Sequence, residues 1–199
     1  MSEILLFNKY SSAVSVRDPA LVKYINLSPV VVPRNAGRQE ARAFWKSEDM
    51  HIVERLVTHL MVPGHRGKSH LYTSGRNTGK FSSNLNRVLR AFEIIEEKTK
   101  KNPVEVLVRA VENAAPMEEI TTVEYGGARY PQAVDVSPQR RVDIALRVMV
   151  QGAYQKSFGK KQKMFEALAE EILSAYKLDQ KSASVSKKLE LERMADAAR

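Results

Sequence analysis

Apolar residues recur at steps of three and four along most of the chain, which is the spacing of one face of an α-helix. We expect a first helix from about Ser47, whose hydroxyl can cap the first turn, to the Pro63-Gly64 pair that stops it. A second helix is predicted after Phe81. The positions expected to be buried in these two helices are Ile52, Val53, Leu56, Val57, Leu60, Met61, Phe81, Leu85, Val88, Phe92 and Ile95.

A proline that directly follows a capping residue marks the start of two more helices, at Asn102-Pro103 and at Ser137-Pro138. Two further helical patterns close the chain, at about 163–177 and 184–198. The positions expected to be buried in these four helices are Leu107, Val108, Val111, Val142, Ala145, Leu146, Met149, Ala153, Met164, Leu168, Ile172 and Tyr176. The pattern therefore predicts a mainly α protein of about six helices.

The segment at about 118–136 departs from this spacing. β-Branched and aromatic residues stand on both sides of Gly126-Gly127, and glycine readily takes the positive φ angles of a type I′ hairpin turn. Pro131 has no N–H to donate, so we expect the hairpin to lie at an edge or to project from the helices. Two strands alone are marginal in water, so the hairpin must rest on another element.

The N-terminal residues 1–47 show no sustained periodicity and contain three prolines. We interpret them as a partly extended arm, and residues 48–199 as one helical domain. Within 34–46 a cation recurs every four residues, and Phe44 and Trp45 lie among them. A solvated helix face and a basic arm laid on a phosphate backbone both fit this spacing; the residues concerned are Arg34, Arg38, Arg42 and Lys46.

The composition indicates the class of protein and its compartment. Of the 199 residues, 43% are hydrophobic, an ordinary balance for one globular domain. The chain has no cysteine, which excludes disulfides, thiolate nucleophiles and cysteine zinc sites. No signal peptide and no apolar stretch of roughly 18 residues is apparent, so we expect a soluble cytoplasmic protein. The net charge of +9 favours a polyanionic partner.

The cations gather in four segments: the arm, a loop at 64–80, the hairpin tip and the helix that follows Ser137. No acidic residue occurs between Met61 and Phe92. The arginine fork matches two phosphate oxygens, and bases can stack on aromatic rings. This convergence predicts RNA binding by Arg66, Lys68, Arg76, Lys80, Arg129, Arg140, Arg141 and Arg147 besides the arm, with Trp45, Tyr125 and Tyr130 as possible stacking surfaces.

Motifs for other chemistries are incomplete. The two Gly-Lys clusters, at 63–69 and 75–81, lack the spacing of a phosphate-binding loop. Four histidines, at 51, 59, 65 and 70, are irregularly spaced and have no cysteine or nearby acid to complete a zinc site. The carboxylates near the hairpin are explained by solvation, and no GxSxG motif is present. We therefore expect no enzymatic activity, no metal and no cofactor.

Five segments, taken in order, carry a likeness to a known family. They read KYINLSPVVVP, IVERLVTHLM before a Pro-Gly stop, NPVEVLVRAVENAAP, VDVSPQRRVDIALR and ALAEEILSAY. Together they resemble the universal ribosomal protein seven family of the small subunit, in its archaeal and eukaryotic form. The resemblance runs from about Lys23 to the end of the chain, and it implies a six-helix domain with a protruding β-hairpin.

The resemblance also implies a function: a structural constituent of the small ribosomal subunit. Such a protein binds the 3′ major domain of small-subunit rRNA, nucleates assembly of the subunit head, and holds its hairpin near exit-site tRNA and the mRNA exit path. Neighbouring ribosomal proteins of the head are further partners. The likeness implies rRNA contact for Arg34, Arg38, Arg42, Lys68, Arg76, Lys80, Arg140 and Arg141, and the hairpin role for Gly126, Gly127 and Arg129.

Two rival functions fit a basic helical protein. An RNA-processing enzyme would need acids or histidines beside the basic face, and incubation with labelled rRNA and magnesium would reveal it. A regulatory module would bind mRNA or DNA outside the ribosome and would not sediment with small subunits.

Overall fold

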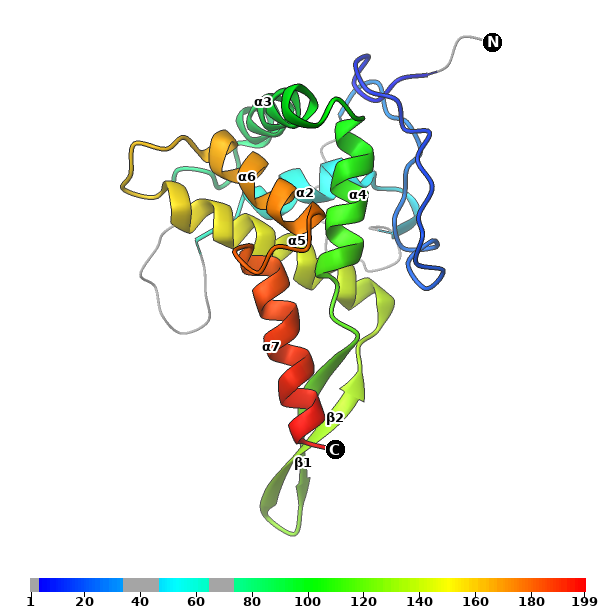
Figure 1. The fold of residues 1–199 in the computed structure, drawn as a ribbon, viewed down its shortest axis with the longest axis vertical. Helices are drawn as coiled ribbons and strands as arrows, with labels where there is room; N and C mark the ends of the chain where they lie inside the picture. Colours follow the sequence, from blue (N-terminus) through cyan, green and yellow to red (C-terminus); the bar gives the residue numbers. More distant parts are fainter. Residues whose placement is uncertain (1–3, 34–46, 65–73) are drawn as a thin grey trace.

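A computed structural model describes residues 4–33, 47–64 and 74–199. In this part of the chain, six helices and one hairpin follow in the order α2 (Ile52–Leu60), α3 (Phe81–Thr99), α4 (Pro103–Ala114), β1 (Glu118–Tyr125), β2 (Ala128–Asp135), α5 (Pro138–Ser157), α6 (Met164–Tyr176) and α7 (Ala183–Ala197). The hairpin projects from one end of the helical body (Figure 1). The expected mainly α fold with a single projecting hairpin is confirmed.

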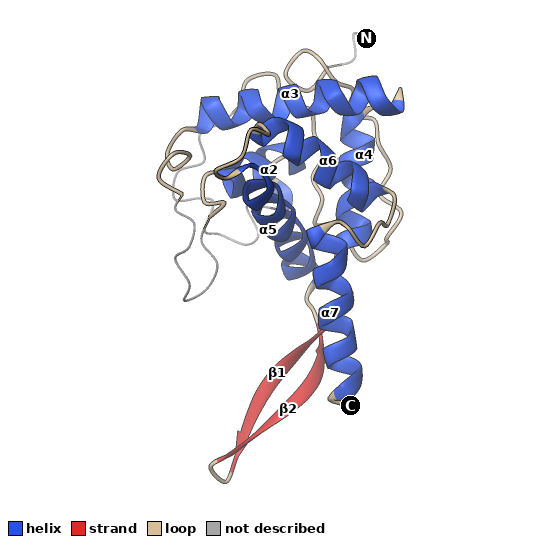
Figure 2. Ribbon diagram, turned by 60° about the vertical axis from the view of Figure 1, so that its left-hand side comes forward, coloured by secondary structure: helices blue, strands red, loops and turns tan. Residues whose placement is uncertain are grey.

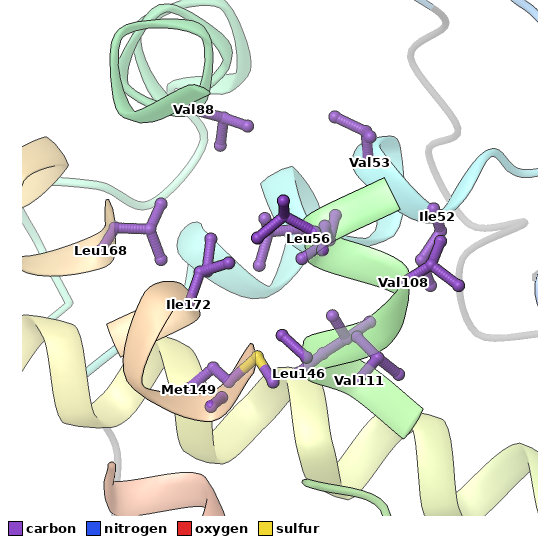
Figure 3. Packing of buried hydrophobic residues seen from close by; sticks show 14 of the residues in the cluster. Ile52, Val53, Leu56, Val88, Val108, Val111, Leu146, Met149, Leu168 and Ile172 are labelled. Carbon is purple, nitrogen blue, oxygen red and sulfur yellow. The ribbon is translucent and has the colours of Figure 1, made fainter. Parts of the chain in front are cut away.

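The predicted apolar stripes meet in one core. Side chains of α2, α3, α4, α5 and α6 point into a shared space (Figure 3), among them Leu56, Val88, Val111, Leu146 and Ile172, all of which are fully buried. Burying an aliphatic side chain of this size contributes about 1.5–3 kcal/mol. Of the predicted positions, those at helix ends are only partly buried, namely Met61, Phe81, Met164 and Tyr176. The core holds the helices in fixed positions relative to one another.

α2 begins later than the sequence pattern suggests. Ser47 does not cap it: the chain is helical at Ser47, turns, and starts α2 only at Ile52. The cap is His51, whose Nδ1 accepts a hydrogen bond from the Val53 N–H at 3.1 Å, while Glu54 accepts one from the His51 N–H at 3.3 Å. Histidine lies outside the usual capping residues, which explains why the start was misplaced.

Stability should fall as the pH drops below 6.5, because His51 is buried in its neutral form. Burial lowers the pKa of His51 to about 4. In the unfolded chain the His51 imidazole therefore takes up a proton near pH 6.5, whereas in the folded chain it does so only near pH 4. Between these values the free energy of unfolding should fall by about 1.4 kcal/mol per pH unit, or about 2 kcal/mol at pH 5.

Urea unfolding at pH 7 and pH 5 measures this loss. The control is His51→Asn, which keeps a capping side chain but does not titrate. Other groups contribute equally to both proteins, so the difference between them isolates His51. An equal loss of stability in the two proteins would contradict the assignment.

The described part of the N-terminal arm packs against the helical body. Leu6, Tyr10, Leu21 and Ile25 are buried in the common core. The Tyr10 ring meets Phe92 of α3 edge-on, with the ring centroids 5.7 Å apart. These contacts lie far apart in the sequence and follow no helical spacing, so the sequence pattern did not reveal them. Residues 4–33 thus form one packed body with the helices, which we call the platform.

The hairpin rests on α7, as expected for a two-stranded ribbon. α7 packs along the base of the hairpin (Figure 2), and it contacts β1 more than β2. Glu192 of α7 accepts a hydrogen bond from the Met117 N–H at 3.1 Å, and Arg199 forms an ion pair with Glu118. The base of the hairpin is therefore anchored, while its distal half projects into solvent.

A buried carboxylate fixes the start of α7. Glu171 of α6 is fully buried and accepts hydrogen bonds from the Ser182 hydroxyl at 2.7 Å and the Ser184 N–H at 3.2 Å. It also pairs with Lys156 of α5 at 2.8 Å. Because a buried charge is costly unless it is paired and hydrogen-bonded, this network ties α5, α6 and α7 together in one arrangement.

Candidate nucleic-acid interface

The N-terminal end of α3 is a cluster of positive groups. Arg76 and Lys80 are exposed on the short turn that precedes the helix. Lys80 is the N-cap residue, its side chain makes no capping hydrogen bond, and the first turn contains no acid. The positive end of the helix dipole and the two cations therefore favour an anion at the same place. This geometry is compatible with phosphate contact.

The turn that presents these cations is held by side-chain amides. Asn77 is buried, and its side-chain oxygen accepts a hydrogen bond from Arg87 at 2.5 Å. Arg87 also donates to the Asn84 side chain at 2.7 Å, and the Asn84 amide in turn donates to the Asn77 carbonyl at 3.0 Å. The loop residues at 74–80 are thus fixed to the first turns of α3.

Further cations lie at the middle of α3 and on the connection that leads into α6, and the sequence reasoning missed them. Arg90 of α3 and Lys163, just before α6, each lie 5.8 Å from the centre of the Phe165 ring. The connection from α5 to α6 also exposes Lys160 and Lys161. The run GKKQK at 159–163 was the available signal. We call this group the α3–α6 basic end; it comprises Arg76, Lys80, Arg87, Arg90, Lys160, Lys161 and Lys163.

The three predicted arginines of α5 occupy different environments. Arg147 is exposed on the outer side of the helix. Arg140 is exposed and donates to both carboxylate oxygens of Glu119, at 2.7 and 2.9 Å. Hydrogen bonding to Glu119 raises the pKa of Arg140, which stays charged. Arg140 therefore anchors the base of the hairpin while part of its side chain remains open to solvent.

Arg141 is placed differently from its neighbour. Its side chain is 8% exposed, and its guanidinium donates to the Pro116 carbonyl at 3.1 Å and to Asp18 at 2.9 Å. It joins α5 to the N-terminal arm and to the segment that leads into the hairpin. In this conformation the charge of Arg141 supports the platform, whereas that of Arg140 lies at the surface.

The hairpin turn has the expected backbone. Gly126 and Gly127 take φ angles of 58° and 80°, and Tyr125 pairs with Ala128 across the two-residue loop. Arg129 is exposed and lies 3.6 Å from Glu124. The structure separates Arg129 from the α3–α6 basic end, because the hairpin projects from the opposite end of the molecule (Figure 1). The predicted cations that the structure describes therefore do not all gather at one place.

Part of the predicted site lies outside the described residues. This holds for Arg34, Arg38, Arg42, Trp45, Lys46, Arg66 and Lys68. Two of the four histidines, His65 and His70, also fall there, whereas His51 caps α2 and His59 faces Asp143 at 3.5 Å.

No metal-binding group of three or more His, Cys, Asp or Glu side chains occurs among the residues that the structure describes. Within the same residues, no helix combines the length and the apolar content needed to cross a membrane. The described surface instead has two features: cations on a rigid helical body, and a projecting hairpin.

Comparison with known proteins identifies the class. The family model for ribosomal protein S7p/S5e matches residues 21–199, so the chain belongs to this family of ribosomal proteins. The small ribosomal subunit protein uS7 of Nanoarchaeum equitans is 52% identical over 186 residues, covering 94% of this chain and 93% of the relative. The uS7 protein of Archaeoglobus fulgidus is 46% identical over 198 residues, covering 99% and 96%.

Membership in this family establishes the coarse function. The chain is a structural protein of the small ribosomal subunit, with rRNA and other ribosomal proteins as its partners. The family is not enzymatic, which confirms the expectation that the chain is no enzyme and excludes the RNA-processing rival. Its place is in the ribosome, in the cytoplasm, as expected.

Proposed function

We propose that this protein binds the 3′ major domain of small-subunit rRNA and nucleates assembly of the subunit head. The observation that carries the proposal is the α3–α6 basic end: seven cations on the N-terminal half of α3, on the turn before it and on the connection that leads into α6. Phosphate contacts supply most of the affinity, and RNA shape supplies the selectivity. The proposal also includes rRNA contact by cations of the arm and of the loop at 65–73, namely Arg34, Arg38, Arg42, Lys46, Arg66 and Lys68.

The hairpin has a separate role in this proposal. It reaches toward exit-site tRNA and the mRNA exit path, with the turn at Gly126 and Gly127 foremost. Its support by α7 and by Arg140 favours such a role, because an anchored base holds the distal half at a fixed position. The described half of the arm and Arg141 position the platform.

Sedimentation tests the placement in the subunit. The tagged protein should co-migrate with small subunits through a gradient after a moderate salt wash. A pool that stays at the top of the gradient, bound to mRNA or DNA, would favour the regulatory module instead.

A pair of lysines on one helix tests the basic end. Lys80→Gln should weaken binding to a 3′ major domain rRNA fragment and reduce the salt slope, d log K/d log [salt], by roughly 0.7–0.9, because one phosphate contact is lost. Lys98→Gln is the matched control: Lys98 is exposed in the last turn of α3, at the far end of the helix.

Filter binding at several salt concentrations measures both variants. The control should keep the wild-type affinity and slope. Equal effects of the two substitutions would mean that net charge alone matters, and would argue against a binding face at the N-terminal end of α3.

A further inference from the structure

The register divides the hairpin into two different faces. Residues directly opposite one another in an antiparallel pair share a face, and successive residues alternate between faces. One face carries the pairs Tyr125–Ala128, Val123–Tyr130 and Thr121–Gln132, and the other carries Glu124–Arg129, Thr122–Pro131 and Ile120–Ala133. The two tyrosines that flank the turn therefore lie together on one side, which we call the tyrosine face.

The rings of the tyrosine face are open to solvent. Tyr125 is 82% exposed, Tyr130 57% and Val123 43%. The two tyrosines occupy diagonal positions on adjacent rungs, a separation that aromatic side chains can bridge. Neither tyrosine side chain makes a hydrogen bond or ring contact within the described residues. The exposed apolar surface of two large rings on an anchored hairpin is unfavourable in water, and a bound partner would cover it.

The charged side chains of the hairpin disfavour phosphate binding at the tyrosine face. The tyrosine face carries no side chain that is charged at neutral pH between the Thr121 rung and the turn. Arg129 lies on the opposite face beside Glu124. From Glu118 to Asp135 the hairpin has four acidic residues and one arginine. A phosphate backbone is therefore held weakly here, in contrast to the α3–α6 basic end.

We propose that the tyrosine face binds unpaired RNA bases by stacking on Tyr125 and Tyr130. Stacking needs a flat exposed ring and no cation, and it accepts any base because every base has a π-face. Thr121 and Gln132, one rung further from the turn, carry groups that can hydrogen-bond base edges. The inference rests on the proposed function, since that function brings the hairpin to the unpaired parts of tRNA and mRNA.

The size of the face argues against a protein as its occupant. From the Thr121 rung to the turn it carries six side chains, whereas a stable protein interface uses about 20–30 residues on each side. Two rings suffice for one or two bases. Since the contact has no ion pair, base binding at the hairpin should change little with salt, while rRNA binding by the body should change steeply.

The test uses the full-length protein and a short oligoadenylate RNA at about 0.5 M salt, where exposed phosphate contacts are largely screened. NMR follows the ring signals of the seven tyrosines, assigned through single Tyr→Phe variants. The signals of Tyr125 and Tyr130 should shift on titration and the others should not. Replacing either tyrosine with leucine, which is apolar but has no ring, should lower the affinity about 5- to 150-fold for each base that loses its ring.

Two controls keep the outcome clear. Tyr125→Phe with Tyr130→Phe keeps both rings and should bind as the wild type does. Arg129→Gln changes the opposite face and should leave oligoadenylate affinity unchanged. Unaltered affinity in the double leucine variant, or shifts confined to the other tyrosines, would overturn the proposal.

A protein contact would give a third pattern, which also overturns the proposal. The double leucine variant would then bind oligoadenylate normally, but reconstituted subunits would lose a neighbouring ribosomal protein. The proposed function is judged separately, by rRNA-fragment binding of the wild type at low salt. If the wild type does not bind the rRNA fragment, the proposed function fails, and the oligoadenylate result can still be interpreted separately.

Discussion

Replacing Asp143 with alanine should lower the free energy of unfolding by about 3–5 kcal/mol, because it leaves a buried guanidinium without its partner. The side chain of Arg55 in α2 is 1% exposed and lies 2.9 Å from the Asp143 carboxylate in α5. Arg55 also donates to the Tyr24 carbonyl of the arm at 2.8 Å. Burial lowers the pKa of Arg55, and the hydrogen-bonded Asp143 opposes that shift.

Among the residues that the structure describes, Arg55 forms an ion pair with no carboxylate other than Asp143. His59 lies 3.5 Å from the same carboxylate, but an imidazole carries no negative charge and cannot take its place. Removing the Asp143 carboxylate should also weaken the packing of α2 against α5 and the arm, since Arg55 and Asp143 join these three segments. Rigid presentation of the cations depends on this contact.

Chemical unfolding followed by circular dichroism measures the change. Glu93→Ala is the matched control, because it removes the acid of an exposed ion pair, Lys9 to Glu93 at 2.5 Å, and should cost at most about 1 kcal/mol. The double variant Arg55→Met with Asp143→Leu should recover most of the loss, since no unpaired charge remains. Equal small effects of Asp143→Ala and Glu93→Ala would contradict this account.

Raising the salt concentration should weaken rRNA binding steeply. Each neutralised phosphate contributes roughly 0.7–0.9 to the slope of log affinity against log salt, through release of its counterions. If about six phosphates are neutralised, the affinity should fall about a thousandfold between about 50 and 200 mM salt. Six of the seven cations of the α3–α6 basic end are exposed, so this surface contains enough cations for contacts in this number.

Filter binding or fluorescence anisotropy with a 3′ major domain fragment gives the slope. The double leucine variant of the tyrosine face is a useful comparison, because it should retain the wild-type slope. A slope near zero would refute the electrostatic mechanism and would leave the basic end as an ordinary solvated surface.

The elements of the fold were predictable where local chemistry decides them. Alternation around Gly126-Gly127 predicted a hairpin, and the lack of an N–H at Pro131 predicted that it lies at an edge or projects; the structure has a projecting hairpin between Glu118 and Asp135. Prolines at the first helical positions fixed the starts of α4 and α5. α2 was misplaced at its start because a histidine and a glutamate form the cap.

The arrangement of the arginines was less predictable. Arg140 and Arg141 look equivalent in the sequence, but consecutive helical residues are about 100° apart around the axis. One therefore faces solvent and the other the body, and only the positions of Asp18 and Pro116 show which. The contribution of Lys160, Lys161 and Lys163 likewise depends on the packing of α6 against α3, which is set by contacts distant in the sequence.

The most direct test of the central claim is a hydroxyl-radical footprint of the purified protein on naked small-subunit rRNA. Protected nucleotides should fall within the 3′ major domain, and the variant Arg76→Gln with Lys80→Gln should lose a contiguous subset of them. Protections scattered over all domains, or a footprint unchanged in that variant, would contradict the account.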